Sequence, residues 1–139
     1  MSIGLPTGPG EARAASAEEV LDISVRRFSQ VHVIKLKGNF RLGPGVDEFR
    51  TATDSLLREG YSQLAVNLAE VPMMDSSAIG VIVRLMTSAR SRGGNVKLVN
   101  PSKLVLQTLK MVGLLNIFEI FEDDTKAIES YGASATTPS

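Results

Sequence analysis

The chain has 139 residues, of which 43% are hydrophobic and 22% are charged, a balance typical of one globular domain. Fifteen basic side chains offset fifteen acidic ones, so no overall field favours nucleic acid or anionic lipid as a partner. The lack of cysteine excludes disulfides, thiolate catalysis and cysteine-based zinc sites, and the single histidine, His32, excludes a histidine-rich metal cluster.

The two ends of the chain differ from its centre. Residues 1–17 and 132–139 are rich in small residues without a hydrophobic period, and are predicted to be a flexible leader and a flexible tail. Residues 18–131 are the predicted domain. No apolar stretch approaches the roughly 18 residues of a membrane span, and the first residues lack the features of a secretory signal. We therefore expect a cytoplasmic protein.

The first half of the domain alternates strand and helix patterns. Residues 21–28 and 31–37 are predicted strands joined by a tight turn, and His32 shares one face of the second strand with two apolar residues. Pro44 suits the first turn of a helix that ends at Gly60. The apolar stripe of this helix comprises Val46, Phe49, Ala52, Leu56 and Leu57.

The second half continues the alternation. The predicted elements are a strand over residues 64–68, a helix from Asp75 to about Arg92, a strand over 96–99, a helix capped by Asn100-Pro101 and ending at Gly113, a short strand over 116–121, and a final helix from Asp123-Asp124. Strands separated by helices favour parallel neighbours with right-handed crossovers, and the initial hairpin adds an antiparallel edge. The prediction is an α/β domain with a mixed sheet.

This topology predicts a shared edge for three loops. Right-handed crossovers bring the carboxyl ends of the second, third and fourth strands to one rim, where residues 38–45, 69–76 and 100–102 meet. Ligands of open α/β sheets commonly bind at that rim. The segment Asp75-Ser76-Ser77 lies on it.

Two interpretations of the Asp75-Ser76-Ser77 segment compete. A serine before an apolar helix often caps it, because the hydroxyl accepts a backbone N–H and contributes roughly 1 kcal/mol. Alternatively, one of the two serines is a phosphorylation site on a docking surface. The outer line of the helix that follows comprises Gly80, Arg84, Thr87 and Ser91. Because glycine has no side chain, the surface beside the serines is predicted to be flat enough for close approach by another protein.

Phosphorylation at this place would separate folding from binding. A helix N-terminus favours negative charge by about 0.3–1 kcal/mol, so the fold should tolerate the phosphate. A dianion buried in an interface beside Asp75 would cost several kcal/mol through repulsion and desolvation. The residues alone leave Ser76 and Ser77 as equal candidates for the acceptor.

A resemblance to a known family extends these inferences. Residues 74–81, Met-Asp-Ser-Ser-Ala-Ile-Gly-Val, resemble the signature of the STAS domain, the fold of bacterial anti-sigma factor antagonists. Residues 66–68 are similar to the central strand of that family. Further positions fit its helix–glycine–leucine segment: Val105, Leu109, Gly113, Leu114 and Phe118. The resemblance covers nearly the whole predicted domain and implies a four- to five-stranded mixed sheet with about four helices.

The resemblance also implies a function. Its phosphorylated members use the serine directly after the aspartate, which is Ser76, with Ser77 as the second choice. The implied partners are an anti-sigma factor that is a serine kinase, bound by the unphosphorylated protein, and a serine phosphatase that restores the switch. Two departures occur: Ala78 replaces a common glycine, and Arg41 lies in a loop that is commonly acidic. The predicted partner-binding residues are Asn39, Arg41, Gly43, Asp75, Ser76, Ser77, Gly80 and Arg84.

Other classes of protein fit less well. An enzyme is not expected, because no phosphate-binding motif surrounds Gly43 and no histidine base is placed near Ser76. The acidic residues Glu70, Asp75 and Asp123 fall in different loops and helix starts, so no metal or cofactor is expected. Direct contact with nucleic acid, membrane or a small-molecule substrate is not expected either. The alternative function is an unphosphorylated STAS scaffold in a sensory assembly, or a STAS subunit attached to a transporter.

Overall fold

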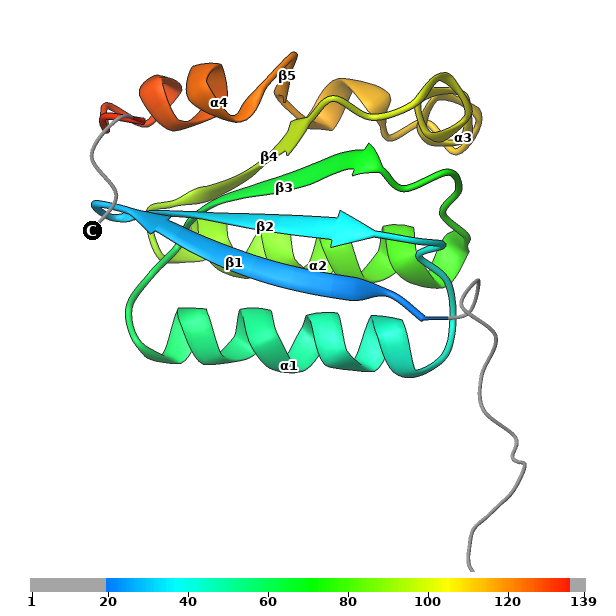
Figure 1. Cartoon of the computed structure of the whole chain (residues 1–139), viewed down its shortest axis with the longest axis horizontal. Coiled ribbons are helices and arrows are strands. Elements are labelled where there is room, and N and C mark those ends of the chain that lie inside the picture. The colour runs from blue at the N-terminus through cyan, green and yellow to red at the C-terminus, as the bar shows by residue number, and fades with distance from the viewer. Residues whose placement is uncertain (1–19, 136–139) are drawn as a thin grey trace, which may run out of the picture.

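The structure, a computed structural model, describes residues 20–135. The predicted leader, residues 1–17, and the last four residues of the predicted tail lie outside this range. The elements in chain order are β1 (Asp22–Phe28), β2 (Val31–Lys37), α1 (Pro44–Arg58), β3 (Gln63–Glu70), α2 (Ser76–Ser91), β4 (Asn95–Val99), α3 (Lys103–Met111), the 3-10 helix η2 (Leu115–Ile117), β5 (Ile120–Phe121) and α4 (Asp124–Ser130) (Figure 1).

One mixed sheet organises the described residues. Its five strands lie in the order β1-β2-β3-β4-β5. β1 and β2 form an antiparallel hairpin, and the other neighbouring pairs are parallel. The prediction of a single mixed α/β domain with about four helices is therefore confirmed.

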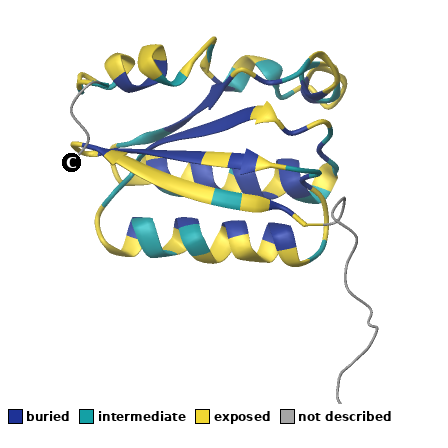
Figure 2. Cartoon of the chain, in the orientation of Figure 1, coloured by how far each residue is buried: buried dark blue, intermediate teal, exposed yellow. Residues whose placement is uncertain are grey.

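Helices cover both faces of the sheet (Figure 1). Strand β2 shows why: Ile34 and Leu36 point into the larger core with α1 and α2, while Val31 and Val33 point into a smaller core with α4. Strand β3 is buried from Leu64 to Leu68, as its apolar run predicted, and Figure 2 shows the same burial along the central strands. The sheet is thus the middle layer of three.

Two local predictions were wrong, and a third was incomplete. Helix α3 is capped by Ser102, whose hydroxyl accepts the N–H of Val105 at 3.2 Å, whereas Asn100 takes a φ of 48° and turns the chain before the cap. The predicted strand over 116–121 is strand only at Ile120–Phe121, because η2 turns the preceding residues toward the larger core. The predicted stripe of α1 is buried or half-buried throughout, but it also contains the buried Thr53, whose hydroxyl is satisfied by donating to the Phe49 carbonyl at 2.8 Å.

The first residues of the predicted tail lie against the domain. Ala133 and Ala135, in the predicted tail, pack against the smaller core. Within residues 20–135, no helix is both long and apolar enough to cross a membrane.

Candidate functional site

The loops after β2 and β3 are joined by backbone hydrogen bonds at the carboxyl end of the sheet. The N–H of Gly38 donates to the Glu70 carbonyl at 2.9 Å, and that of Phe40 donates to the Met73 carbonyl at 3.1 Å. The N–H of Asp75 in turn donates to the Phe40 carbonyl at 3.2 Å. The ring of Phe40 is fully buried against Phe49, with centroids 5.0 Å apart. The two loops therefore form one fixed surface. The third loop of the predicted rim instead bonds to β5, through Asn100 N–H and the Phe121 carbonyl.

Asp75 holds this surface together through its side chain. It is the N-cap of α2: one carboxylate oxygen, Oδ1, accepts the N–H of Ala78 at 2.9 Å. The other, Oδ2, accepts the N–H of Leu42 at 2.9 Å, from the loop after β2. The helix cap in this segment is thus the aspartate and not a serine. Because Asp75 does the capping, neither serine hydroxyl is needed for it.

Ser76 and Ser77 are the first two residues of α2 and differ in exposure. Ser76 is exposed, and Ser77 is half-buried. Neither hydroxyl forms a hydrogen bond with a described residue, since the nearby backbone N–H groups bond to Asp75 and the helix. The Ser76 hydroxyl is therefore accessible without the loss of a hydrogen bond to a described residue.

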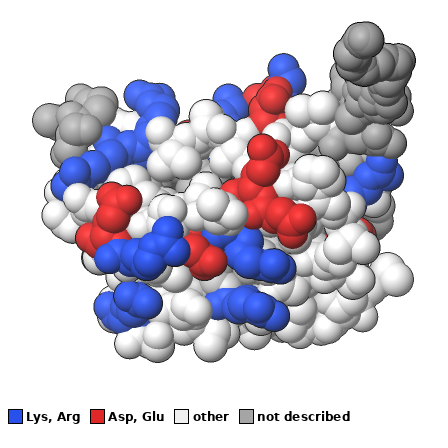
Figure 3. All heavy atoms as spheres, turned by 90° about the horizontal axis from the view of Figure 1, so that it is seen from below, with Lys and Arg blue, Asp and Glu red and all other residues white. Residues whose placement is uncertain are grey.

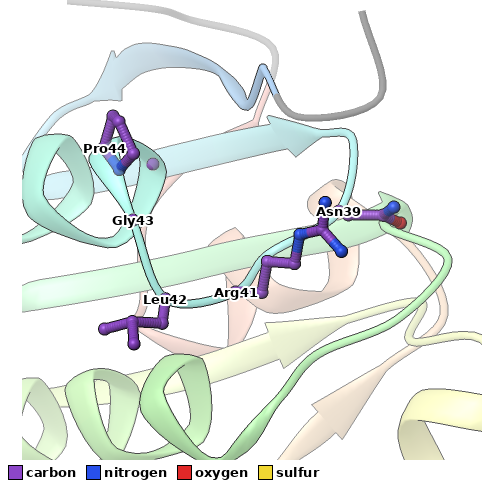
Figure 4. A pocket seen from close by; sticks show the side chains of 6 residues that line it. Asn39, Arg41, Leu42, Gly43 and Pro44 are labelled. Atoms are coloured by element: carbon purple, nitrogen blue, oxygen red, sulfur yellow. The ribbon is translucent and has the colours of Figure 1, made fainter. Parts of the chain in front are cut away.

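The loop from Asn39 to Gly45 encloses a hollow of about 270 Å³ (Figure 4). Arg41 is exposed, and in Figure 4 its guanidinium lies next to Asn39. Gly43 has a φ of 138°, a conformation that disfavours any side chain, so this glycine turns the loop into α1. Of the predicted site residues in this loop, Gly43 shapes the backbone, whereas Asn39 and Arg41 line the hollow with their side chains.

Leu42 is a surface residue that sequence reasoning missed. Its side chain is 74% exposed although its backbone is fixed by Asp75. Figure 4 shows it on a different side of the loop from Arg41. The sequence did contain a signal for this residue, namely a large apolar side chain between Arg41 and Gly43 in a loop predicted to lie at the rim. An exposed apolar side chain on a rigid backbone is a common anchor in protein interfaces.

The remaining predicted residues lie along α2. Gly80 and Arg84 are exposed, and both line a hollow of about 320 Å³ between α1 and α2 together with Ser77 and Leu42. The structure therefore brings Asp75, both serines, Gly80 and Arg84 onto the same surface as Leu42. Asn39 and Arg41 line the other hollow, and Leu42 lines both.

Other titratable groups are engaged away from this surface. Glu70 pairs with Lys35 at 3.2 Å, and Asp123 caps α4. Asp124 accepts a hydrogen bond from Asn67 at 2.8 Å. His32 lies near the start of β2, at the opposite end of that strand from the rim, so it is not placed to act as a base for Ser76. Among the described residues, no three acidic or histidine side chains gather as a metal ion would require.

The arrangement is that of a known domain family, since the STAS domain matches residues 22–127, most of the described chain. The chain belongs to the STAS domain family. A curated relative named as an anti-sigma factor antagonist, from Thermotoga maritima, is 34% identical over 76 residues, which are 55% of this chain and 67% of the relative.

Two solved structures extend the likeness. An anti-sigma factor antagonist from Thermotoga maritima superposes with a TM-score of 0.72 at 26% identity, covering 78% of this chain and 92% of that one. The Bacillus cell fate determinant SpoIIAA, solved in its phosphorylated form, superposes with a TM-score of 0.66 at 20% identity, covering 79% and 99%, and shows the shared fold. STAS domains of this kind are non-enzymatic binding proteins, and this chain is placed among them.

Proposed function

We propose that this STAS domain is an anti-sigma factor antagonist that is switched by phosphorylation of Ser76. In its unphosphorylated form it binds an anti-sigma factor that is a serine kinase, and so releases a sigma factor. The observation that carries the proposal is the exposed hydroxyl of Ser76, free of any capping role, beside Asp75 on a rigid rim. The names of the relatives support the anti-sigma factor as the partner.

The local geometry explains why phosphorylation would leave the fold intact. Ser76 is the first residue of α2, where a negative charge is favoured by about 0.3–1 kcal/mol. The hydrogen bonds of Asp75 to Ala78 and Leu42 do not involve the Ser76 hydroxyl. The phosphate would therefore add charge at the surface without removing a cap.

The same phosphate would oppose binding. In the complex it would lie within the interface beside the carboxylate of Asp75, where repulsion and lost hydration cost several kcal/mol. Since about 1.4 kcal/mol corresponds to a tenfold change in affinity, binding would fall by about a hundredfold or more. Phosphorylation would therefore release the partner while the domain stays folded.

Exposure favours Ser76 over Ser77 as the acceptor. Ser76 is exposed, whereas Ser77 is half-buried and lines the hollow between the two helices. A kinase must place the acceptor oxygen in line with the γ-phosphate of ATP, which requires an accessible hydroxyl. Ser77 remains the second candidate.

The proposal includes the other partners and the compartment. A serine phosphatase would restore the unphosphorylated form, and ATP and magnesium would belong to the kinase. Because a sigma factor acts on transcription, this role belongs in the cytoplasm. The protein itself would bind neither nucleic acid, membrane nor a small-molecule substrate.

The test uses Ser76→Ala, Ser76→Asp and the matched control Ser77→Ala against each anti-sigma factor kinase of the same genome. Ser76→Ala should bind the kinase but gain no phosphate with ATP, as measured by intact mass. Ser76→Asp should fold and bind at least tenfold more weakly by calorimetry. Ser77→Ala should still gain one phosphate.

Two outcomes would contradict the proposal. Equal affinity of Ser76→Ala and Ser76→Asp for the kinase would exclude the switch. A wild-type protein that never gains a phosphate, yet binds a transporter or a sensory assembly, would establish the scaffold alternative instead.

A further inference from the structure

The hollow between α1 and α2 begins beside the serines. Its volume is about 320 Å³, enough for one or two side chains of a partner, and its lining residues are Leu42, Val46, Asp47, Arg50, Ser77, Gly80, Val81 and Arg84. A smaller depression continues it along the two helices and shares Arg50, Val81 and Arg84. Together they form a groove that starts at the candidate phosphorylation site.

The hollow beside the serines is lined by two basic residues and one acidic residue, whereas the depression that continues it is also lined by Asp54. Arg84 forms no ion pair with a described residue, and α2 contains two arginines but no acidic residue. Arg50 faces one carboxylate of the groove, Asp47, at 4.0 Å, a distance at the limit of an ion pair. In Figure 3, basic side chains are prominent in the lower half of the face seen from below, with acidic atoms between and above them and further basic groups near the upper edge. Two guanidinium groups therefore face one carboxylate in the hollow.

The rest of the lining is apolar and open. Val46 and Val81 are 2% and 5% exposed and form the floor, while Leu42 stands at the edge with its backbone fixed by Asp75. Gly80 leaves the wall open: a Cβ placed there would meet no atom within 4 Å. The hollow thus combines an apolar floor with two guanidinium groups.

We propose that this hollow receives an acidic side chain of the anti-sigma factor. Its carboxylate pairs with Arg84 and Arg50, and a neighbouring apolar side chain of the partner packs on Leu42 and the valine floor. This inference rests on the proposed function and specifies the chemistry of the partner at that same surface. A guanidinium recognises a carboxylate through paired, charge-assisted hydrogen bonds, which makes the contact specific.

The position of the groove also connects it to the switch. Ser77 and Gly80 lie on the same side of α2 as the hollow, one turn or less from Ser76. Arg84 follows Ser76 by eight residues on α2, roughly 12 Å along the helix axis, so a partner carboxylate bound at Arg84 would be repelled by the phosphate only through a screened interaction. Both groups are negative, so phosphorylation at Ser76 would repel an acidic partner more strongly than a neutral one.

The test measures affinity for the anti-sigma factor at several salt concentrations. Arg84→Glu should bind at least tenfold more weakly than wild type, because it replaces a positive charge that faces the partner's carboxylate with a negative one. The wild-type dissociation constant should rise with salt, and the Arg84→Ala constant should rise less. Arg58→Glu is the matched control, since it makes the same charge change at the other end of α1 and should bind like wild type.

A second variant tests the shape of the hollow. Gly80→Leu should fill the open space and weaken binding at least tenfold. It should not lower the urea midpoint of unfolding, because leucine is a better helix former than glycine and meets no neighbour there. Weak binding by a stable variant cannot be attributed to unfolding.

The outcomes separate the two proposals. If wild type binds no anti-sigma factor, the proposed function fails and this inference fails with it. If wild type binds, but Arg84→Glu and Gly80→Leu bind equally well, only this inference is overturned. If the affinity of wild type does not depend on salt, the partner does not place an acidic side chain in the hollow. This inference is then overturned, whereas the proposed function stands.

Discussion

The two ends of the sheet use polar and aromatic side chains in opposite ways. At the carboxyl end, Asp75 fixes the backbone of two loops and leaves Leu42 and Ser76 exposed. At the amino end, the phenol of Tyr131 shares its one proton between the backbone carbonyls of Leu64 and Asn95, whose oxygens lie at 2.7 and 2.8 Å on two strands. The carboxyl end therefore exposes side chains that can contact a partner, whereas the side chains at the amino end bond within the domain.

Further contacts close the amino end. His32 packs on the ring of Tyr61 with centroids 4.5 Å apart, and the guanidinium of Arg27 lies 4.7 Å from the same ring centroid. Nearby, the ammonium of Lys97 donates to the Ser130 hydroxyl at 2.8 Å and lies 4.0 Å from the ring of Tyr131. Burial raises the pKa of the Tyr131 phenol far above its usual value, so it stays a neutral donor.

This difference shows how one small sheet can carry a docking surface. A binding surface needs side chains that are free in the unbound protein and a backbone that does not need ordering on binding. Asp75 supplies the rigid backbone at the carboxyl end. The contacts at the amino end instead anchor α4 to the starts of the strands.

The largest expected effect on stability comes from Asp75→Ala. It removes two hydrogen bonds to a carboxylate, so the free energy of unfolding should fall by about 2 kcal/mol and the loop carrying Leu42 should loosen. Asp123→Ala is the matched control, because Asp123 caps α4 through one such bond and should cost about 1 kcal/mol. Urea unfolding of both variants measures the difference, and equal losses would show that the Leu42 bond contributes nothing.

A smaller effect is expected at the amino end from Tyr131→Phe. The variant keeps the ring over Lys97 but loses the hydroxyl that bonds to Leu64 and Asn95. Unfolding should become easier by about 1 kcal/mol, without any change in affinity for the anti-sigma factor. Tyr61→Phe is the control, since its hydroxyl bonds to no described residue. Loss of partner binding in Tyr131→Phe would contradict the division between the two ends.

The smallest effect is a dependence of stability on pH at His32. Burial, and then the charge of Arg27, lower the pKa of this buried imidazole below its ordinary value of 6.5, against a smaller opposing effect of Glu59. As the pH falls below 6.5, the unfolded chain takes up a proton before the folded one does, so the free energy of unfolding decreases. Well above pH 6.5 the imidazole is neutral in both the folded and the unfolded chain, so His32 no longer lowers the free energy of unfolding.

His32→Phe isolates this effect. Phenylalanine keeps the ring contact with Tyr61 and removes both the titration and the buried Nδ1, which has no hydrogen-bond partner among the described residues. Urea midpoints measured between about pH 7.5 and about pH 5.5 should fall less in the variant than in wild type. The same slope in both proteins would assign the pH dependence to other groups.

Much of the fold was predictable because its signals are local. The alternation in β2 placed Ile34 and Leu36 on one face, and the continuous apolar run of β3 indicated burial on both sides. The errors occurred where a distant contact decides the local structure. η2 replaces part of a predicted strand because Leu115 and Ile117 pack on the larger core, a contact that no local period reveals.

By itself, the sequence determined the order of the elements and the family signature at residues 74–81, and the resemblance carried by that signature favoured Ser76 over Ser77 as the candidate acceptor. Only the tertiary structure decided that Asp75, not a serine, caps α2 while also holding Leu42. It also decided that Arg50 and Arg84, from two helices, line the same hollow. The reason is physical: periodicity and propensity act within a few residues, whereas a site formed by two loops and two helices exists only after the sheet has brought them together.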